Sequence, residues 1–319
     1  MITLNNTEYP VTYCATGARG FLKEGYPFHK VWQHFGMIWE GTGFSGKTMT
    51  LDSRLGNMPL KADGTTPEEL FPACIKVDFF RHGGEMMNAV GLSNFGLEFY
   101  LKQGMYQKLT EPFFISIHLE AEDIAGQEAE LQCICDLIKM FGPYKAMAIQ
   151  INYGCPNSDQ DPSSFYETIC NHVSIVKAEL QMPVFVNCNA LMPSDVLAEV
   201  ARVADGLWVG NTIPWRDPET IDLIDWDSIG VTSPIKARGI DADGGLSSHQ
   251  CLQFTIRKVA ELRDNGVNKP IIAGNGIRTM DDIHSLKQVG ANGCFVGSIG
   301  VVRPRGMREV TSYSNHIFS

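Results

Sequence analysis

The chain has little of what marks several large classes of protein. It has no surplus of positive charge, because 26 Lys and Arg oppose 36 Asp and Glu and the formal net charge is −10. That balance argues against nucleic acid or an anionic membrane as the main partner. No apolar run approaches the roughly 20 residues that span a bilayer. The first ten residues lack the basic start and apolar centre of a secretory signal, so we expect a cytoplasmic protein.

Metal-binding and disulfide patterns are also missing. The nine cysteines are scattered without a Cys-x-x-Cys pair, and the eight histidines show no ligand spacing. We therefore expect reduced thiols and no metal or iron–sulfur site within this chain. No low-complexity segment or long linker divides the sequence, and 44% hydrophobic residues suffice for a large core. A single domain covering residues 1–319 is the expectation.

What the sequence does contain is an alternation of short apolar runs with helix-length segments. It predicts a (β/α)8 TIM barrel, with a doubly wound open sheet as the alternative. The candidate strands are 11–16, 36–39, 113–118, 146–152, 183–187, 206–211, 270–274 and 293–297. The candidate helices are 128–141, 163–180, 194–204, 249–265 and 280–289. Two long irregular segments, 40–95 and 213–248, are expected to form insertions over the C-terminal mouth.

The most informative motif follows the predicted fourth strand and reads Asn152-Tyr-Gly-Cys-Pro-Asn157. It places two carboxamides and the thiol of Cys155 at one strand end. Carboxamides suit a planar ligand with imide or amide edges, because each donates and accepts. A thiol of lowered pKa can act as a base, acid or nucleophile. A structural turn with a buried cysteine is the alternative for this motif alone.

Later strand ends repeat this design. Asn187 follows the fifth predicted strand, and Asn211 and Thr212 follow the sixth. Three glycine-bearing turns come after them, at residues 244–247, 274–277 and 297–299. In many barrels the loops after strands seven and eight bind phosphate, and glycines let backbone N–H groups approach it. We expect a phosphate site there, for flavin mononucleotide or a phosphorylated substrate, with ordinary turn glycines as the alternative.

From about residue 10 to about residue 310, these motifs resemble the dihydroorotate dehydrogenase family of FMN-dependent barrels. The resemblance is carried by order and spacing along the chain. The motifs are Lys47-Thr-Met-Thr-Leu51, Arg54-Leu-Gly-Asn57, Asn88-Ala-Val-Gly-Leu-Ser-Asn94, the 152–157 hexapeptide, Gly244-Gly-Leu-Ser247, Gly274-Asn-Gly276 and Gly297-Ser298. Class 1 members are soluble, and the missing membrane helix disfavours the membrane-bound class.

The resemblance implies a role for each matching residue. Cys155 would remove the C5 proton of dihydroorotate while a hydride passes from C6 to flavin N5, and Lys47 would meet both the flavin and the substrate carboxylate. The substrate would be bound by Lys47, Asn88, Val90, Gly91, Leu92, Asn152, Asn157, Asn211 and Thr212. FMN would be bound by Ala15, Thr16, Gly17, Lys47, Ser116, Asn152, Asn187, Gly244, Gly245, Gly274, Asn275, Gly276, Gly297 and Ser298.

The sequence departs from the family at two positions. The family usually has a lysine near flavin N1 and O2, and Asn187 stands in its place. The cofactor would therefore lack a cation at N1. Asn275 replaces a glycine, and asparagine tolerates left-handed backbone. The family implies a homodimer with fumarate as acceptor, or an iron–sulfur electron-transfer subunit with NAD. Two alternatives stay open: a reductase like the tRNA-dihydrouridine synthases, which share Asn-x-Gly-Cys-Pro, and a catalytically idle protein that binds FMN or a pyrimidine.

Overall fold

Eight parallel strands form the centre of the protein, in the computed structural model that describes residues 2–154 and 162–319. Every neighbouring pair in this sheet is parallel. In order around the sheet the strands are β3 (Thr12–Cys14), β16 (Gly293–Val296), β15 (Ile271–Ala273), β12 (Gly206–Val209), β11 (Val184–Cys188), β10 (Met147–Asn152), β9 (Phe113–Ile117) and β4 (Phe44–Ser45).

The two outer strands of this order, β3 and β4, meet and close the barrel. A parallel bridge joins Tyr13 to Gly43, the Gly43 amide donates to the Thr12 carbonyl at 2.8 Å, and the Cys14 amide donates to the Gly43 carbonyl at 3.0 Å. The predicted (β/α)8 barrel is therefore confirmed, and the open sheet is excluded.

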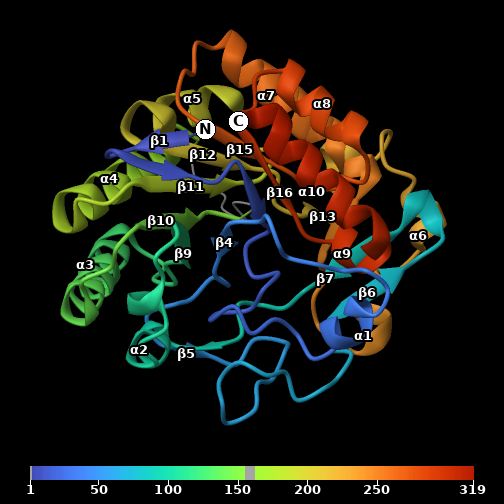
Figure 1. Ribbon diagram of the computed structural model, residues 1–319, viewed down its shortest axis with the longest axis horizontal. Coiled ribbons are helices and arrows are strands. Elements are labelled where there is room, and N and C mark those ends of the chain that lie inside the picture. Colours follow the sequence, from blue (N-terminus) through green and yellow to red (C-terminus); the bar gives the residue numbers. More distant parts are fainter. Residues whose placement is uncertain (1, 155–161) are drawn as a thin grey trace.

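In Figure 1 most of the long helices lie above and to the left of the strands, and much of the segment that follows β4 lies below them. The longer helices are α2 (Leu97–Lys102), α3 (Ile124–Phe141), α4 (Pro162–Leu180), α5 (Ser194–Val203), α7 (Leu252–Asp264), α8 (Met280–Gln288) and α10 (Pro304–Phe318). Short ones are α1 (His29–Gln33), α6 (Trp226–Ile229) and α9 (Ile299–Val302). The 3-10 turns are η1 (Arg81–Gly83), η2 (Tyr106–Lys108), η3 (Pro218–Thr220), η4 (Lys236–Arg238) and η5 (His249–Cys251).

One predicted strand is wrong. Residues 36–39 form no strand: Gly36 takes φ +98° in the turn after α1, and Met37 is buried in the core as part of a loop. The second barrel strand is β4 instead, only two residues long and preceded by Gly-Thr-Gly. The apolar signal at 36–39 reflects burial of a loop side chain rather than strand pairing.

Aromatic rings fill the barrel beneath its C-terminal mouth. Tyr13, Phe114, Phe185, Trp208 and Phe295 come from five different strands. Their ring centroids lie 5.0–5.5 Å apart in successive pairs. Such edge-to-face and stacked contacts fix the rings beyond the effect of area burial. The barrel interior is thus a solid floor, and anything bound at the mouth rests on it.

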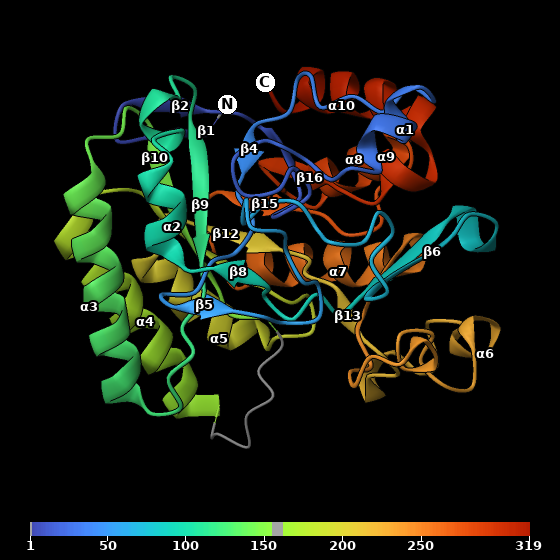
Figure 2. The ribbon, with the colours of Figure 1, turned by 90° about the horizontal axis from the view of Figure 1, so that it is seen from below.

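The two predicted insertions meet in one antiparallel sheet beside the mouth. Its order is β13 (Ile213–Pro214), β14 (Gly245–Ser248), β7 (Glu85–Asn88) and β6 (Ile75–Asp78). Figure 2 shows β6 and β13 on the same side of the barrel, with α6 beyond them. Two smaller antiparallel pairs complete the strands: β1 (Ile2–Leu4) with β2 (Thr7–Tyr9), and β5 (Ser53–Arg54) with β8 (Asn94–Phe95).

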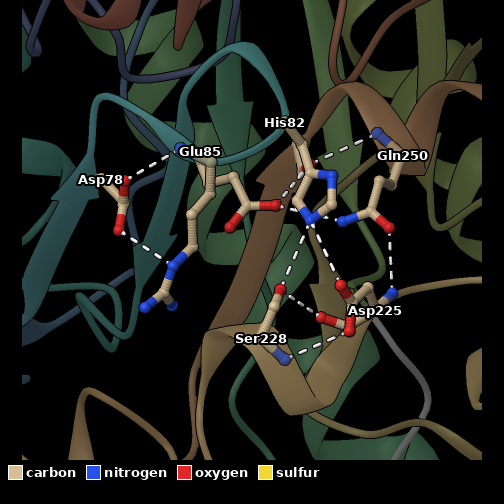
Figure 3. Close-up of polar contacts among 8 residues, drawn as sticks. Asp78, His82, Glu85, Asp225, Ser228 and Gln250 are labelled. Carbon is tan, nitrogen blue, oxygen red and sulfur yellow. Dashed lines mark hydrogen bonds and ion pairs between the residues drawn. The ribbon is translucent and has the colours of Figure 1, made fainter.

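Polar contacts join β7 and η1 to β14, to η5 and to the segment between β13 and β14 (Figure 3). Glu85 is 3% exposed, and its Oε1 accepts from Ser248 Oγ at 3.0 Å and from Gln250 Nε2 at 3.1 Å. His82 Nε2 lies 3.7 Å from Asp225 Oδ2, and Gln250 Oε1 accepts from the Asp225 amide at 2.9 Å. These contacts hold β7, whose last residue is Asn88, at a fixed place over the mouth. In the part of the chain that the structure describes, no helix is long and apolar enough to cross a membrane.

Candidate active site

A cavity of about 490 Å³ opens at the C-terminal ends of the barrel strands. All eight strands contribute a residue at or just after their end, as catalytic barrels require. In strand order along the chain, these residues include Thr16, Lys47, His118, Asn152, Asn187, Asn211, Asn275 and Gly297. The insertion sheet adds residues 88–92 from the end of β7. The volume lies in the usual range for small-molecule sites.

Carboxamides and hydroxyls form a connected network on one wall of the cavity. Asn211 Nδ2 donates to Asn152 Oδ1 at 3.3 Å, and Asn152 Nδ2 donates to Thr48 Oγ1 at 3.0 Å. The Thr48 hydroxyl pairs with Ser116 Oγ at 2.9 Å. The network holds Asn152 and Asn211 in place without adding net charge, so a planar ligand meets preset donors and acceptors.

Lys47 is the buried cation of the site. It follows β4 and is 7% exposed; its Nζ donates to the Ser93 carbonyl and lies 4.6 Å from the centre of the Phe21 ring. Burial lowers the pKa of Lys47 to about 7. A buried ammonium contacted by a carbonyl and an aromatic face is stabilised when an anion arrives. Lys47 is therefore suited to a carboxylate or another anionic ligand.

The segment after β7 brings backbone groups into the cavity. Val90, Gly91 and Leu92 line it, with Gly91 at φ +66° and Leu92 at φ +58°. Asn57 fixes this turn, because its backbone amide donates to the Val90 carbonyl at 2.9 Å and its Nδ2 donates to the Ala89 carbonyl at 2.8 Å. The left-handed residues turn the chain back on itself beside Asn88.

The late turns approach the cavity as closely as glycine permits. Gly276 takes φ +89°, and a Cβ there would lie 2.0 Å from the Ser248 carbonyl oxygen. A Cβ on Gly297 would lie 2.8 Å from the Ala15 Cβ. Asn275 takes φ +78°, which confirms its expected left-handed backbone. Gly276, Gly297 and Ser298 all line the cavity, and backbone amides in glycine-bearing turns suit a phosphate.

Most of the predicted site residues lie together at this cavity, but not all of them do. Ser116 is fully buried behind Thr48. Gly244 and Gly245 lie behind the lining, with Gly245 paired to Asn88. Gly274 lies against the Phe295 ring, which a Cβ would approach to 2.5 Å. These four residues support the lining rather than form it. Cys155 and Asn157 lie outside the described residues.

Sequence reasoning missed several polar residues here, among them Thr48, Gln150 and Arg278. Thr48 stands inside the Lys47 motif and could have been found from it. Gln150 on β10 is fully buried and lies two residues before Asn152, on the same face of the strand. Only the period-2 pattern of the sequence marks it as interior. Arg278 lines the cavity at 3% exposure; its Nη1 donates to the Ile277 carbonyl at 2.8 Å and its Nη2 to the Gly84 carbonyl at 3.1 Å.

Buried polar atoms at the cavity fit a bound flavin cofactor. Among the described residues, Asn187 Oδ1, Asn275 Oδ1 and Arg278 Nε are buried without a hydrogen-bond partner. Unpaired buried groups carry a desolvation cost, and they are common where a ligand completes the structure. Together with the close glycines and Lys47, they suit a planar group with amide edges that carries a phosphate.

Fold and site define a (β/α)8-barrel enzyme with a mouth for planar, amide-edged ligands. The family model described as dihydroorotate dehydrogenase matches residues 39–307, and the chain belongs to this family of oxidoreductases. The family assignment made from the sequence is confirmed.

Several curated proteins are similar to this chain. The catalytic subunit of dihydroorotate dehydrogenase B (NAD(+)) from Listeria welshimeri is 30% identical over 228 residues, which is 69% of this chain and 68% of that protein. The protein of the same name from Alkaliphilus metalliredigens is 27% identical over 235 residues, covering 71% and 70%. A protein of Aquifex aeolicus named for dihydroorotate dehydrogenase A (fumarate) is 27% identical over 270 residues, covering 81% and 75%.

Proposed function

We propose that this protein oxidises dihydroorotate to orotate through bound FMN, as a step of pyrimidine biosynthesis. The observation that carries the proposal is the Asn152–Asn211 carboxamide pair, preset in the same cavity as the buried Lys47. A planar anion edged with imide groups matches both features. A site of this kind discriminates strongly, because a ligand that lacks the amide edges leaves buried carboxamides unpaired.

The substrate ring lies among the carboxamides in this proposal. Asn88, Asn152 and Asn211 line the cavity, and Asn157 would join them from the hexapeptide. These carboxamides form hydrogen bonds with the donors and acceptors at the ring edge. Lys47 supplies the point charge for the carboxylate. Thr212 and the backbone at Val90, Gly91 and Leu92 close the pocket around the ring.

The chemical roles follow the same arrangement. Cys155 acts as the general base that removes the C5 proton, which requires a thiolate during the reaction. Bound FMN would supply the acceptor of the C6 hydride at its N5. Ala15, Thr16, Gly17 and Asn187 would lie along the flavin ring, and Asn275, Gly276, Gly297 and Ser298 would hold its phosphate end. Ser116, Gly244, Gly245 and Gly274 stabilise these residues from behind.

The electron acceptor and the assembly are further parts of the proposal. The similarity to catalytic subunits of NAD(+)-named enzymes supports an electron-transfer partner subunit. The Aquifex relative, named for fumarate, supports a stand-alone homodimer instead. A cytoplasmic location suits either form. Mixing the reduced protein anaerobically with fumarate distinguishes them: rapid reoxidation supports the stand-alone enzyme, and no reoxidation supports the partner subunit. Light scattering then gives the mass, and a monomer would contradict the homodimer.

Ligand binding tests the proposal independently of turnover. Titration of the flavin-loaded protein with orotate should perturb the visible flavin spectrum and saturate. Asn211→Ala should weaken orotate binding roughly tenfold, because one buried amide contact contributes about 1–2 kcal/mol. Asn171→Ala removes an exposed carboxamide on α4 and is the matched control. A flavin-loaded protein that ignores orotate would contradict the proposed substrate.

A further inference from the structure

Asn187 and Gln150 form a hydrogen-bonded pair inside the barrel mouth. Asn187 Nδ2 donates to Gln150 Oε1 at 3.3 Å, and the Thr16 hydroxyl donates to the same oxygen at 2.8 Å. Asn187 is 4% exposed and lines the cavity, while Gln150 is fully buried behind it. The pair is neutral, and its Asn187 stands where the resemblance expects a lysine.

Half of the hydrogen-bonding capacity of this pair is unused. Gln150 Nε2 and Asn187 Oδ1 are buried without a partner among the described residues. Because the Asn187 Oδ1 is fully buried, the side-chain atom through which Asn187 can meet a ligand is its Nδ2, a donor. In this arrangement the pair presents an N–H to an acceptor on the ligand and retains its internal hydrogen bond.

The direction of the hydrogen bond can be reversed. A carboxamide keeps its shape when it is turned by half a rotation, since its oxygen and NH2 group are similar in size. If both amides turn, Gln150 donates to Asn187, and Asn187 presents an oxygen to the ligand. The Thr16 hydroxyl then accepts from Gln150 and can donate to Ser45 Oγ, which lies 3.1 Å away. Both arrangements have the same number of hydrogen bonds within the protein.

This reversibility matches a chemical property of flavins. Nitrogen N1 of the oxidised ring accepts a hydrogen bond. Two-electron reduction by one hydride at N5 leaves negative charge at N1, unless a proton from water binds there. A buried negative charge without a nearby cation is costly, and the Gln150–Asn187 pair supplies no cation. In its reversed arrangement, however, the pair accepts a hydrogen bond from a protonated N1.

We propose that Gln150 and Asn187 act as one reversible neutral pair that holds a second proton on the reduced flavin, in place of the charge of a lysine. The inference rests on the proposed function, because it assumes bound FMN. Gln150 is a positioning residue here, and Asn187 is the residue in contact with the cofactor. Reduction then takes up two electrons and two protons, one delivered in the hydride and one from solvent, and reoxidation releases both.

Within residues 2–154 and 162–319, the neighbouring barrel strands place no titratable side chain in register with Asn187. The register partners of Asn187 are Asn152 on β10 and Trp208 on β12, and neither titrates. Its neighbour Cys188 is buried, and burial raises the pKa of that thiol to about 12. The titratable side chains that line the cavity are Tyr26, His29, Lys47, His118 and Arg278. Lys47 and Arg278 each donate to backbone carbonyls, and burial lowers the pKa of Lys47 to about 7.

The test is the pH dependence of the flavin midpoint potential, with reduction by a dye couple in place of substrate. For a two-electron couple, a tenfold change corresponds to about 30 mV. Two protons per two electrons therefore lower the potential by about 59 mV per pH unit, and one proton lowers it by about 30 mV. We expect the steeper slope between pH 7.5 and 8.5. The shallower slope in the wild-type protein would overturn the inference.

Three variants test whether the slope depends on Gln150 and Asn187 together. Asn187→Lys alone places a buried cation without a counter-ion and should bind FMN poorly. Gln150→Glu alone should keep the steeper slope, because it adds no cation. The double variant supplies both charges and should regain FMN and halve the slope, a coupling that neither single change produces. A double variant that keeps the steeper slope would overturn the role of the pair.

The outcomes also separate this inference from the proposed function. A protein that oxidises dihydroorotate with the shallower slope would overturn only the reversible pair. A protein that binds FMN with the steeper slope but ignores dihydroorotate would overturn only the proposed substrate. A protein that takes up no flavin would overturn both.

Discussion

The ammonium of Lys47 lies 4.6 Å from the centre of the Phe21 ring and donates its hydrogen bond to a backbone carbonyl, that of Ser93. Nearby carboxylate charge is present, but it has a smaller effect on Lys47 than burial has, and the pKa falls to about 7. The Lys47 ammonium is therefore placed to bind an anionic ligand. This relationship explains how a neutral carboxamide wall and one cation can together select a planar carboxylate.

The pH dependence of orotate binding should follow Lys47. An anionic ligand favours the protonated lysine, so affinity is highest below pH 7 and falls as pH rises above the pKa of the free protein. At pH 8 we expect binding to take up protons, which calorimetry in buffers of different ionisation enthalpy measures. Lys47→Met should bind orotate roughly tenfold or more weakly, without this proton uptake. Equal proton uptake in the variant would assign the linkage to another group.

Gly276 should be required for cofactor binding for a steric reason. Gly276→Ala would place a Cβ 2.0 Å from the Ser248 carbonyl oxygen, so one of these two backbone segments must move. Gly266→Ala is the matched control, because Gly266 has a similar φ of +78° but no atom within 4 Å of its Cβ position. The two variants share the backbone strain of roughly 1 kcal/mol. Only Gly276→Ala should lose bound flavin, as the absorbance ratio of flavin to protein reports.

Glu85 should matter as a hydrogen-bond acceptor rather than as a charge. Burial raises its pKa, so the folded protein binds this proton more tightly than the unfolded chain, and stability falls as pH rises through the folded pKa. Glu85→Gln keeps the acceptor for Ser248 and Gln250 and should be as stable as wild type, or more so, at pH 7. Glu85→Leu leaves both donors unpaired and should lower the free energy of unfolding by about 1–3 kcal/mol. Denaturant titrations of the two variants at pH 5 and pH 7 measure this difference, and an equal loss in both would contradict it.

Cys155 should affect the chemical step and not ligand binding. Cys155→Ala should retain FMN and orotate, since no binding contact is assigned to the thiol, while loss of a general base slows flavin reduction by about two to four orders of magnitude. Stopped-flow absorbance under anaerobic conditions measures that rate. Cys133→Ala, at an exposed thiol on α3, is the control. Unchanged reduction in Cys155→Ala would remove the thiol from the mechanism.

The sequence predicted the parts of the fold that local patterns determine. Runs such as Phe113–Ile117 are apolar except for Ser116, because both faces of a barrel strand are buried. The two-residue strand β4 gave no such signal, because Gly43 and Ser45 interrupt it. The antiparallel sheet from the two insertions was also missed. Its two halves pair across more than 150 residues, where Gly245 of β14 meets Asn88 of β7, and no local pattern encodes such a pairing.

The site could be predicted where polar residues end apolar strands, as at Asn152 and Asn211. Gln150 escaped notice because it stands within a strand, where an interior polar side chain is visible only through its alternation with Ile149 and Ile151. Arg278 escaped because its burial depends on Gly84, nearly 200 residues earlier in the chain. Partners that come from distant segments make such residues part of the site, and a single sequence does not reveal them.

The central claim is that dihydroorotate delivers electrons to a flavin in this cavity. The most direct measurement is the visible spectrum of the purified, FMN-loaded protein under anaerobic conditions, before and after addition of dihydroorotate. The account predicts that the flavin absorbance bleaches on addition and returns when an acceptor is admitted. A flavin that stays oxidised with dihydroorotate, yet is reduced by dithionite, would contradict the account.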